Sequence, residues 1–300
     1  MDARLAAATE VGHSPAQPAV KPAEPGYISA TAAPGHPHHV HDPNVPTAKK
    51  TMAIEATGLK KYFGKQKVLD GVDIRIPEQE ITMIMGPSGT GKSVFLRCVV
   101  GLMFPDGGDI VVSGQSVPHL STEGLLALRR NVGMLFQDGA LFSSMSLYDN
   151  VAFPLRQHTR KSEKEIHEIV YDRLKEVGLA GADKKYPSEL SGGMKKRAGF
   201  ARALVLEPKI LLFDEPDSGL DPVRTALLSQ LIREISNRYD CTSIIISHDV
   251  NVVRNVADNL AVLYAGKCVA FGSQKEIKDN PDPFIQQFLV GAADGPLGMD

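Results

Sequence analysis

The chain has few cysteines, no surplus of positive charge and no long hydrophobic run. Its three cysteines are far apart and form no C-x-x-C pair, which argues against a disulfide framework or a cysteine zinc site and favours a reducing cytosol. Its 33 Lys and Arg residues are offset by 35 Asp and Glu residues, so nucleic acid is not expected as the main ligand. No run reaches about 18 apolar residues, the length that spans a membrane, and no export signal is expected.

The first 50 residues have almost no large apolar side chains and hold 8 of the 20 prolines. This composition predicts a disordered tail rich in Pro, Ala and His. Four histidines cluster there, at His36, His38, His39 and His41. Because prolines flank the cluster and offer no fixed geometry, we expect a solvated tail rather than a metal site.

From Met52 onward, short apolar runs alternate with helical patterns, which is typical of an α/β domain with a largely parallel sheet. The predicted buried strands are Ile81 to Met85, Val132 to Phe136, Ile210 to Phe213 and Ser243 to Ile246. Residues 52–76 predict shorter strands, with turns at Phe63-Gly64-Lys65 and Asp70-Gly71, that form an antiparallel subdomain. Ser162 to Val177 has helical spacing and predicts a helical insertion.

One segment fits the pattern G-x-x-x-x-G-K-[ST] of a phosphate-binding P-loop. It consists of Gly86, Pro87, Ser88, Gly89, Thr90, Gly91, Lys92 and Ser93. A predicted strand precedes it and a helical pattern follows from Lys92, which is the context that the motif requires. The glycines let successive N–H groups face one phosphate; Lys92 reaches the β and γ phosphates, and Ser93 binds Mg²⁺.

Two adjacent carboxylates, Asp214 and Glu215, follow the predicted strand at residues 210–213. Asp214 suits an outer Mg²⁺ position, and Glu215 can polarise an attacking water. Gln137 and His248 follow two other predicted strands. We therefore expect these four residues and Lys92 at the carboxyl edge of the sheet, where open α/β sheets bind ligands.

A second anion site is predicted at Leu190-Ser191-Gly192-Gly193-Met194, which precedes a helical pattern. Ser191 is a natural N-cap, and the glycines leave backbone N–H groups open. The adjacent Lys195-Lys196-Arg197 is expected to be a solvated helix face rather than a nucleic-acid contact.

Together these ordered motifs resemble the ATP-binding cassette (ABC) family of ATPases, whose signature is L-S-G-G-Q. The resemblance implies a P-loop NTPase (RecA-like) core with an antiparallel β subdomain and an inserted helical subdomain. It places the nucleotide-binding domain at residues 51–272, with the insertion at about 138–190 and a C-terminal extension at 273–300. ATP and Mg²⁺ are the implied cofactors, and Mg²⁺ is implied at Ser93, Gln137 and Asp214.

In that family two ATPs lie between two head-to-tail copies. By resemblance, Ser191, Gly192 and Gly193 contact the nucleotide of the other copy, and Asp221 belongs to the loop that crosses the dimer. Glu215 is the implied catalytic base and His248 the γ-phosphate switch. Phe63 matches the aromatic on which adenine stacks, with Tyr62 as its rival.

The chain departs from the family pattern at two positions. Met194 replaces the signature Gln, and Asp217 replaces the usual Thr after Asp-Glu-Pro. These departures, with several longer stretches, resemble the Mce-associated ATPases of actinobacteria. That resemblance implies an ATP-hydrolysing motor for import of lipids or sterols, on the cytoplasmic face of the membrane. Its implied partners are a second copy, separate integral-membrane permease subunits and, indirectly, Mce substrate-binding proteins.

The permease contact is expected within residues 138–158, where two interpretations stay open. The apolar residues Phe142, Met145, Leu147, Tyr148 and Phe153 either meet the permease or pack inside the helical insertion. The function also has rivals, which are an importer of small polar solutes and a non-transport ABC ATPase.

Overall fold

The computed structural model describes residues 50–290, 294 and 296. Outside this range lie the predicted N-terminal tail up to residue 49, including the histidine cluster, and most of the last ten residues of the predicted C-terminal extension. The strands are β1 (Met52–Phe63), β2 (Gln66–Pro77), β3 (Ile81–Met85), β4 (Gly107–Val112), β5 (Gln115–Ser116), β6 (Val132–Leu135), β7 (Ile210–Asp214), β8 (Thr242–Ile246), β9 (Asn259–Tyr264) and β10 (Lys267–Ser273). The helices are α1 (Lys92–Val99), α2 (Thr122–Arg130), α3 (Leu147–His158), α4 (Glu163–Glu176), α5 (Gly192–Leu204), α6 (Pro222–Arg238), α7 (Val250–Val256), α8 (Gln274–Lys278) and α9 (Pro283–Val290).

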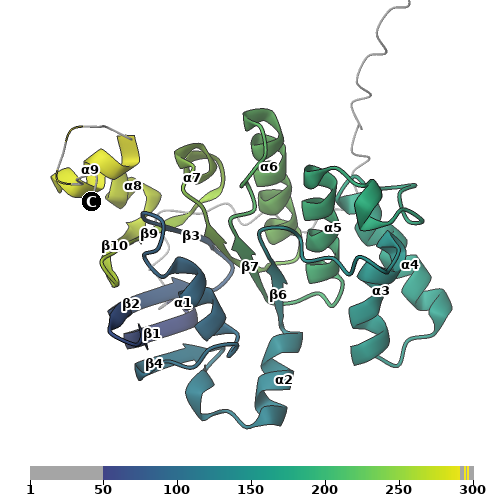
Figure 1. The fold of residues 1–300 in the computed structure, drawn as a ribbon, viewed down its shortest axis with the longest axis horizontal. Helices are drawn as coiled ribbons and strands as arrows, with labels where there is room; N and C mark the ends of the chain where they lie inside the picture. Colours follow the sequence, from purple (N-terminus) through teal and green to yellow (C-terminus); the bar gives the residue numbers. More distant parts are fainter. Residues whose placement is uncertain (1–49, 291–293, 295, 297–300) are drawn as a thin grey trace, which may run out of the picture. The chain divides into compact units, whose positions relative to one another are not determined.

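The larger sheet has the order β10-β9-β3-β8-β7-β6, in which only β10 runs antiparallel to its neighbour (Figure 1). The predicted strand at 81–85 is confirmed, β7 and β8 are each one residue longer than predicted, and β6 ends at Leu135 rather than Phe136. Every residue of β3, β7 and β8 is buried because both faces of the sheet are covered. Successive side chains of a strand point to opposite faces of the sheet, so the neighbours Met83 and Ile84 pack into different hydrophobic clusters.

The second sheet is antiparallel, as predicted, with the order β2-β1-β4-β5. The prediction of shorter strands in 52–76 was wrong, because β1 and β2 are each 12 residues long. The prediction of a turn at Asp70-Gly71 was also wrong. Gly71 has φ +93° inside β2, where the register skips one residue, so it forms a β-bulge that bends the strand.

The helices α3 and α4 occupy the segment where the helical insertion is predicted, and Figure 1 shows them beside α5. A capping box starts α4, since the side chains of Ser162 and Glu165 each accept a backbone N–H of the other. The helix α4 packs into the core through Ile166, Val170 and Leu174. Within the described residues, no helix is both long and apolar enough to cross a membrane.

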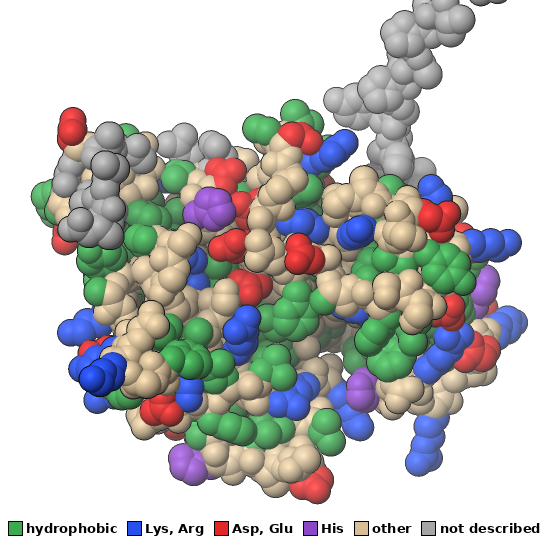
Figure 2. Space-filling model, in the orientation of Figure 1, with side chains coloured by type: hydrophobic (Ala, Val, Ile, Leu, Met, Phe, Trp, Pro, Cys, Tyr) green, Lys and Arg blue, Asp and Glu red, His purple; other side chains and the backbone are tan. Residues whose placement is uncertain are grey.

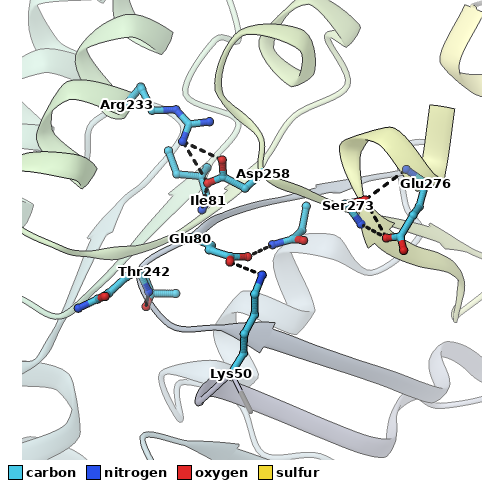
Figure 3. A network of polar contacts seen from close by, with 10 residues as sticks. Lys50, Glu80, Ile81, Arg233, Thr242, Asp258, Ser273 and Glu276 are labelled. Carbon is cyan, nitrogen blue, oxygen red and sulfur yellow. Dashed lines mark hydrogen bonds and ion pairs between the residues drawn. The ribbon is translucent and has the colours of Figure 1, made fainter. Parts of the chain in front are cut away.

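A polar network closes the amino ends of the parallel strands, opposite to the P-loop end (Figure 3). The N–H of Ile81, which starts β3, donates to Asp258 Oδ2 at 2.8 Å, and Arg233 Nη1 donates to Asp258 Oδ1 at 2.9 Å. Lys50 pairs with Glu80 immediately before β3. These contacts satisfy groups at strand starts, so we assign this end of the sheet a structural role.

Candidate nucleotide site

The P-loop follows β3 and runs into α1 through backbone conformations that favour glycine. Gly86, Gly89 and Gly91 have φ of +149°, +80° and +93°. A Cβ on Gly86 would lie 2.1 Å from the carbonyl oxygen of Leu263 in β9. The loop therefore needs glycine at Gly86 for space as well as for conformation.

Lys92, the first residue of α1, is 6% exposed and folds back across the loop. Its Nζ donates to the carbonyl oxygens of Gly86 and Pro87, each at 2.8 Å. Burial lowers the pKa of Lys92, and the nearby carboxylates of Glu215 and Asp214 oppose that shift. The ammonium group is thus held in the phosphate-binding loop beside the two predicted carboxylates.

The predicted Mg²⁺ ligands Ser93 and Asp214 meet directly, since Ser93 Oγ donates to Asp214 Oδ1 at 2.8 Å. They come from α1 and from the end of β7. Among the described residues, no group of three or more His, Cys, Asp or Glu side chains could hold a metal by itself. A hydroxyl beside a carboxylate still suits Mg²⁺, which takes one or two protein oxygens and completes its shell with phosphate and water.

Glu215 follows β7 with φ +48°, a conformation uncommon for a residue other than glycine. Its N–H donates to the carbonyl oxygen of Ile246 at 3.0 Å, which ties the residue to the end of β8. Its carbonyl oxygen accepts the N–H of Ser218 at 3.2 Å. The backbone thus turns sharply just where the predicted base is placed.

Gln137 and His248 lie past the carboxyl ends of β6 and β8, and both are exposed. Gln137 Nε2 donates to Ser218 Oγ at 3.2 Å, three residues beyond Glu215. In the strand order β3-β8-β7-β6, the P-loop, His248, Glu215 and Gln137 follow four neighbouring parallel strands. The structure therefore brings the predicted polar residues to one edge of the sheet.

The predicted signature lies elsewhere. Ser191 caps α5, as predicted, and its Oγ accepts the N–H of Met194 at 3.4 Å. A Cβ on Gly193 would touch side-chain atoms of Leu220 and Arg224 at 3.6 and 3.9 Å, which places the signature beside the start of α6. The starts of α1 and α5 are well apart in Figure 1, so the P-loop and the signature of one chain do not meet.

Two further predicted site residues, Asp221 and Phe63, lie at the start of α6 and at the end of β1. Asp221 caps α6 by accepting the N–H of Arg224 at 3.0 Å. Phe63 ends β1 and is 47% exposed, whereas Tyr62 is engaged through its hydroxyl, which donates to Asp70 at 3.0 Å. The exposed ring of Phe63 favours it over Tyr62 as the platform for adenine.

The expectation of a solvated face at 195–197 was wrong for Lys196, which is only 5% exposed. This side chain points from α5 into the turn that follows Glu215, where it donates to backbone carbonyl groups. Arg197 is also engaged, donating to the carbonyl oxygens of Val177 and Gly178, each at 3.1 Å. The sequence did not predict these roles because a run of three cationic residues does not indicate which side chains are buried.

The apolar residues at 138–158 divide between the two interpretations. Leu147 is fully buried and belongs to the core, whereas Phe142 is 43% exposed. Phe142 and Phe153 pack with ring centroids 5.1 Å apart and line a groove of about 380 Å³. The cationic side chains of Arg129, Arg130 and Arg202 also line it, together with His158.

Charge is mixed over the surface drawn in Figure 2, where Lys and Arg side chains are interspersed with Asp and Glu. On that face the described residues form no continuous basic surface of the kind that tracks a nucleic-acid backbone.

Three comparisons with known proteins bear on this geometry. Residues 69–218 match the family model described as ABC transporter. The chain is 52% identical over 248 residues to the "Probable ribonucleotide transport ATP-binding protein mkl" of Mycobacterium leprae, covering 83% of this chain and 72% of that protein. It is 45% identical over 234 residues to the "Intermembrane phospholipid transport system ATP-binding protein MlaF" of Escherichia coli, covering 78% and 87%.

Two solved structures share the fold. The ATP-binding cassette MJ0796, in a dimeric post-hydrolysis state with ADP and Pi, gives a TM-score of 0.68 at 28% identity and covers 73% of this chain and 98% of that chain. The cbiO1 protein of Clostridium perfringens gives a TM-score of 0.70 at 31% identity and covers 79% and 95%. MJ0796 is an ATP-binding cassette and cbiO1 is part of the ABC transporter complex cbiONQ, in agreement with the predicted fold class.

Proposed function

This chain belongs to the ABC transporter family of ATP-binding proteins, and on that premise we propose that it is the ATP-hydrolysing motor of a lipid transporter. The observation that carries the hydrolytic part is the convergence of the P-loop, Asp214, Glu215, Gln137 and His248 at one sheet edge. The P-loop N–H groups and Lys92 hold the phosphates, and Glu215 accepts a proton from the attacking water. His248 and Gln137 contact the γ-phosphate side of the site.

Mg²⁺ is proposed at Ser93 and Asp214, with Gln137 reaching it from the end of β6. The 2.8 Å contact of Ser93 with Asp214 supports this, because it already aligns two oxygen ligands of the kind that Mg²⁺ prefers. When bound, Mg²⁺ supplies positive charge that offsets the charge on the phosphate oxygens.

The complete site is proposed to need a second copy of the chain. The separation of the signature from the P-loop of the same chain supports this, as does the dimeric state of the similar cassette MJ0796. In a head-to-tail dimer, Ser191, Gly192 and Gly193 contact the nucleotide held by the partner, and Asp221 lies where the chains cross. Substituting Ser191 with Arg should spare nucleotide binding to the monomer but prevent ATP-dependent dimers, as light scattering would report.

A membrane permease is proposed as the partner at the groove of Phe142 and Phe153. Its aromatic lining with cations around it suits a short amphipathic helix that carries apolar and acidic side chains. Ala140, three residues beyond Gln137, lines the groove, so a movement of Gln137 at the nucleotide site would be transmitted to a helix docked there. Such docking would hold the chain at the cytoplasmic face of the membrane.

Lipid is proposed as the transported class, with Mce proteins as indirect partners. The similarity to the phospholipid-system protein MlaF supports it, together with the sequence resemblance to Mce-associated ATPases. The name of the mycobacterial relative specifies ribonucleotide transport, so a polar solute is the second candidate. Import, as opposed to export, stays a prediction.

Affinity purification of the chain from detergent-solubilised native membranes, with mass spectrometry of what stays bound, tests this proposal. Recovery of a multi-span permease with Mce proteins is the expected result. A permease from a polar-solute system would overturn the lipid assignment, and exclusively soluble partners would overturn the transport role. A Phe142→Ala chain, which loses part of the groove, should recover less permease than the native chain.

A further inference from the structure

Lys196 is a buried lysine whose hydrogen-bonding capacity is fully used. Its Nζ donates to the carbonyl oxygens of Glu215 at 3.4 Å, Pro216 at 2.9 Å and Ser218 at 2.5 Å. An ammonium group has three N–H donors, so these three carbonyls match its capacity. The side chain thus spans the turn that carries Glu215 from one end to the other.

Asp217, within the same turn, provides the compensating charge. It is 8% exposed, and its Oδ2 accepts the hydroxyl of Ser247 at 2.8 Å. Its Oδ1 is buried and has no hydrogen-bond partner among the described residues. Burial lowers the pKa of Lys196, and the charge of Asp217 is the largest influence opposing that shift. Asp217 thus supplies a buried negative charge near the buried ammonium group of Lys196, which lowers the cost of burying that ammonium.

The turn itself needs such support. Glu215 has φ +48°, and a non-glycine residue in this region costs about 1–3 kcal/mol unless its surroundings hold it there. Apart from Lys196, backbone hydrogen bonds hold Glu215 at its N–H and at its carbonyl oxygen. Lys196 adds a second donor to that carbonyl oxygen and fixes the two residues that set the direction of the turn.

We propose that Lys196, charge-compensated by Asp217, is a positioning residue that holds Glu215 in its reactive orientation and couples it to the signature helix. The inference rests on the proposed function, in which Glu215 is the base. Lys196 lies on α5 five residues after Ser191, about 7.5 Å along the helix axis. Ser191 contacts the nucleotide of the partner, whereas Glu215 acts on the nucleotide of its own chain. Lys196 thus links the two shared sites within one chain.

The test compares ATP hydrolysis by the native chain and by Lys196→Met, which keeps the length of the side chain but removes its donors. We expect kcat to fall at least about tenfold with KM within about twofold, because a misplacement of about 1 Å can cost about 100-fold. Lys196→Arg, which keeps donors and charge, should recover part of kcat. Lys195→Met is the matched control, one position away, and should hydrolyse ATP within about twofold of the native rate.

A double-substitution cycle separates positioning from general loss of structure. In a Glu215→Gln background, Lys196→Met should lower the residual rate by less than about twofold, because the base that it positions is already gone. Multiplicative losses, or a Lys196→Met chain with near-native kcat, would overturn the inference. If Lys196→Met does not fold, as judged by its thermal melt, Lys196→Gln takes its place in the same cycle. A native chain that fails to hydrolyse ATP would instead refute the proposed function.

Discussion

The side chain of Asn150 organises the groove proposed for the permease. It is fully buried on α3, and its Oδ1 accepts the N–H of Phe142 at 2.8 Å. Its Nδ2 faces three carbonyl oxygens, of Phe142 at 3.1 Å, Met145 at 3.2 Å and Ser146 at 3.0 Å. One amide therefore fixes the loop that presents Phe142 to the groove.

Replacing Asn150 with Ala leaves the N–H of Phe142 without its amide acceptor, whereas the carbonyl oxygen of Phe142 still accepts the N–H of Met145 at 3.2 Å. Two or three lost hydrogen bonds at about 1 kcal/mol each, with a further penalty for groups left unpaired, give a destabilisation of about 3 kcal/mol. For a chain of this size each kcal/mol lowers Tm by about 2–4 °C, so we expect a fall of about 6–12 °C in calorimetry. Permease recovery from membranes should fall further than the folded fraction does.

Asn131→Ala is the matched control for this substitution. Asn131 is exposed, and its Nδ2 makes a long 3.4 Å contact with the carbonyl oxygen of Ala127, so its loss should cost no more than about 0.5 kcal/mol. An Asn150→Ala chain as stable as the control would refute the claim that the amide organises this loop.

Three further outcomes are expected. Phe63→Ala should weaken ATP binding about tenfold in a fluorescence titration, because stacking of an aromatic ring on a base contributes about 1–3 kcal/mol. Tyr62→Ala should change the affinity less than about twofold. If Tyr62→Ala instead had the larger effect, adenine would be assigned to Tyr62. Arg173→Met should lower the free energy of unfolding by about 3 kcal/mol in urea denaturation, since the side chain of Arg173 is only 8% exposed and pairs with Glu176. Arg238 pairs with the same glutamate but is 57% exposed, so Arg238→Met should cost about 1 kcal/mol or less. Equal losses for the two variants would contradict this reasoning. Excess EDTA should stop phosphate release and added Mg²⁺ should restore it, so hydrolysis that persists in EDTA would remove Mg²⁺ from the account.

Much of the fold could be predicted because its main determinants are local. The buried strand at 81–85, the glycines of the P-loop and the serine before α5 each carry their own backbone requirement in the sequence. Since parallel strands order their carboxyl ends along one edge, the meeting of Gln137 with the turn after Glu215 followed from topology.

The rest depended on contacts that no local pattern encodes. Asp217 stands out as a departure from its family pattern, but its partner Ser247 lies 30 residues away. The inward turn of Lys196 follows from how α5 packs on the Glu215 turn, which a run of three cations does not reveal. Gly71 resembles a turn glycine, and only the pairing of β1 with β2 makes it a bulge.

The central claim is that two copies of this chain share each ATP site, and mixing two inactive variants tests it most directly. Glu215→Gln removes the proposed base and should lower turnover about 100- to 10,000-fold while sparing ATP binding. Ser191→Arg blocks the contact of the signature with the nucleotide of the partner. Each variant alone should release almost no phosphate.

In a mixed dimer, the P-loop and Glu215 of the Ser191→Arg chain face the native Ser191 of the Glu215→Gln chain, which rebuilds one complete site. Random pairing of equal amounts would make half of the dimers mixed, each with one of two sites intact, so roughly a quarter of the native rate is the upper bound; the Arg at the second site of each mixed dimer lowers the recovery below it. Phosphate release that rises on mixing is the predicted result. Native turnover by Ser191→Arg alone, or no recovery in a mixture shown to contain mixed dimers, would contradict a shared site.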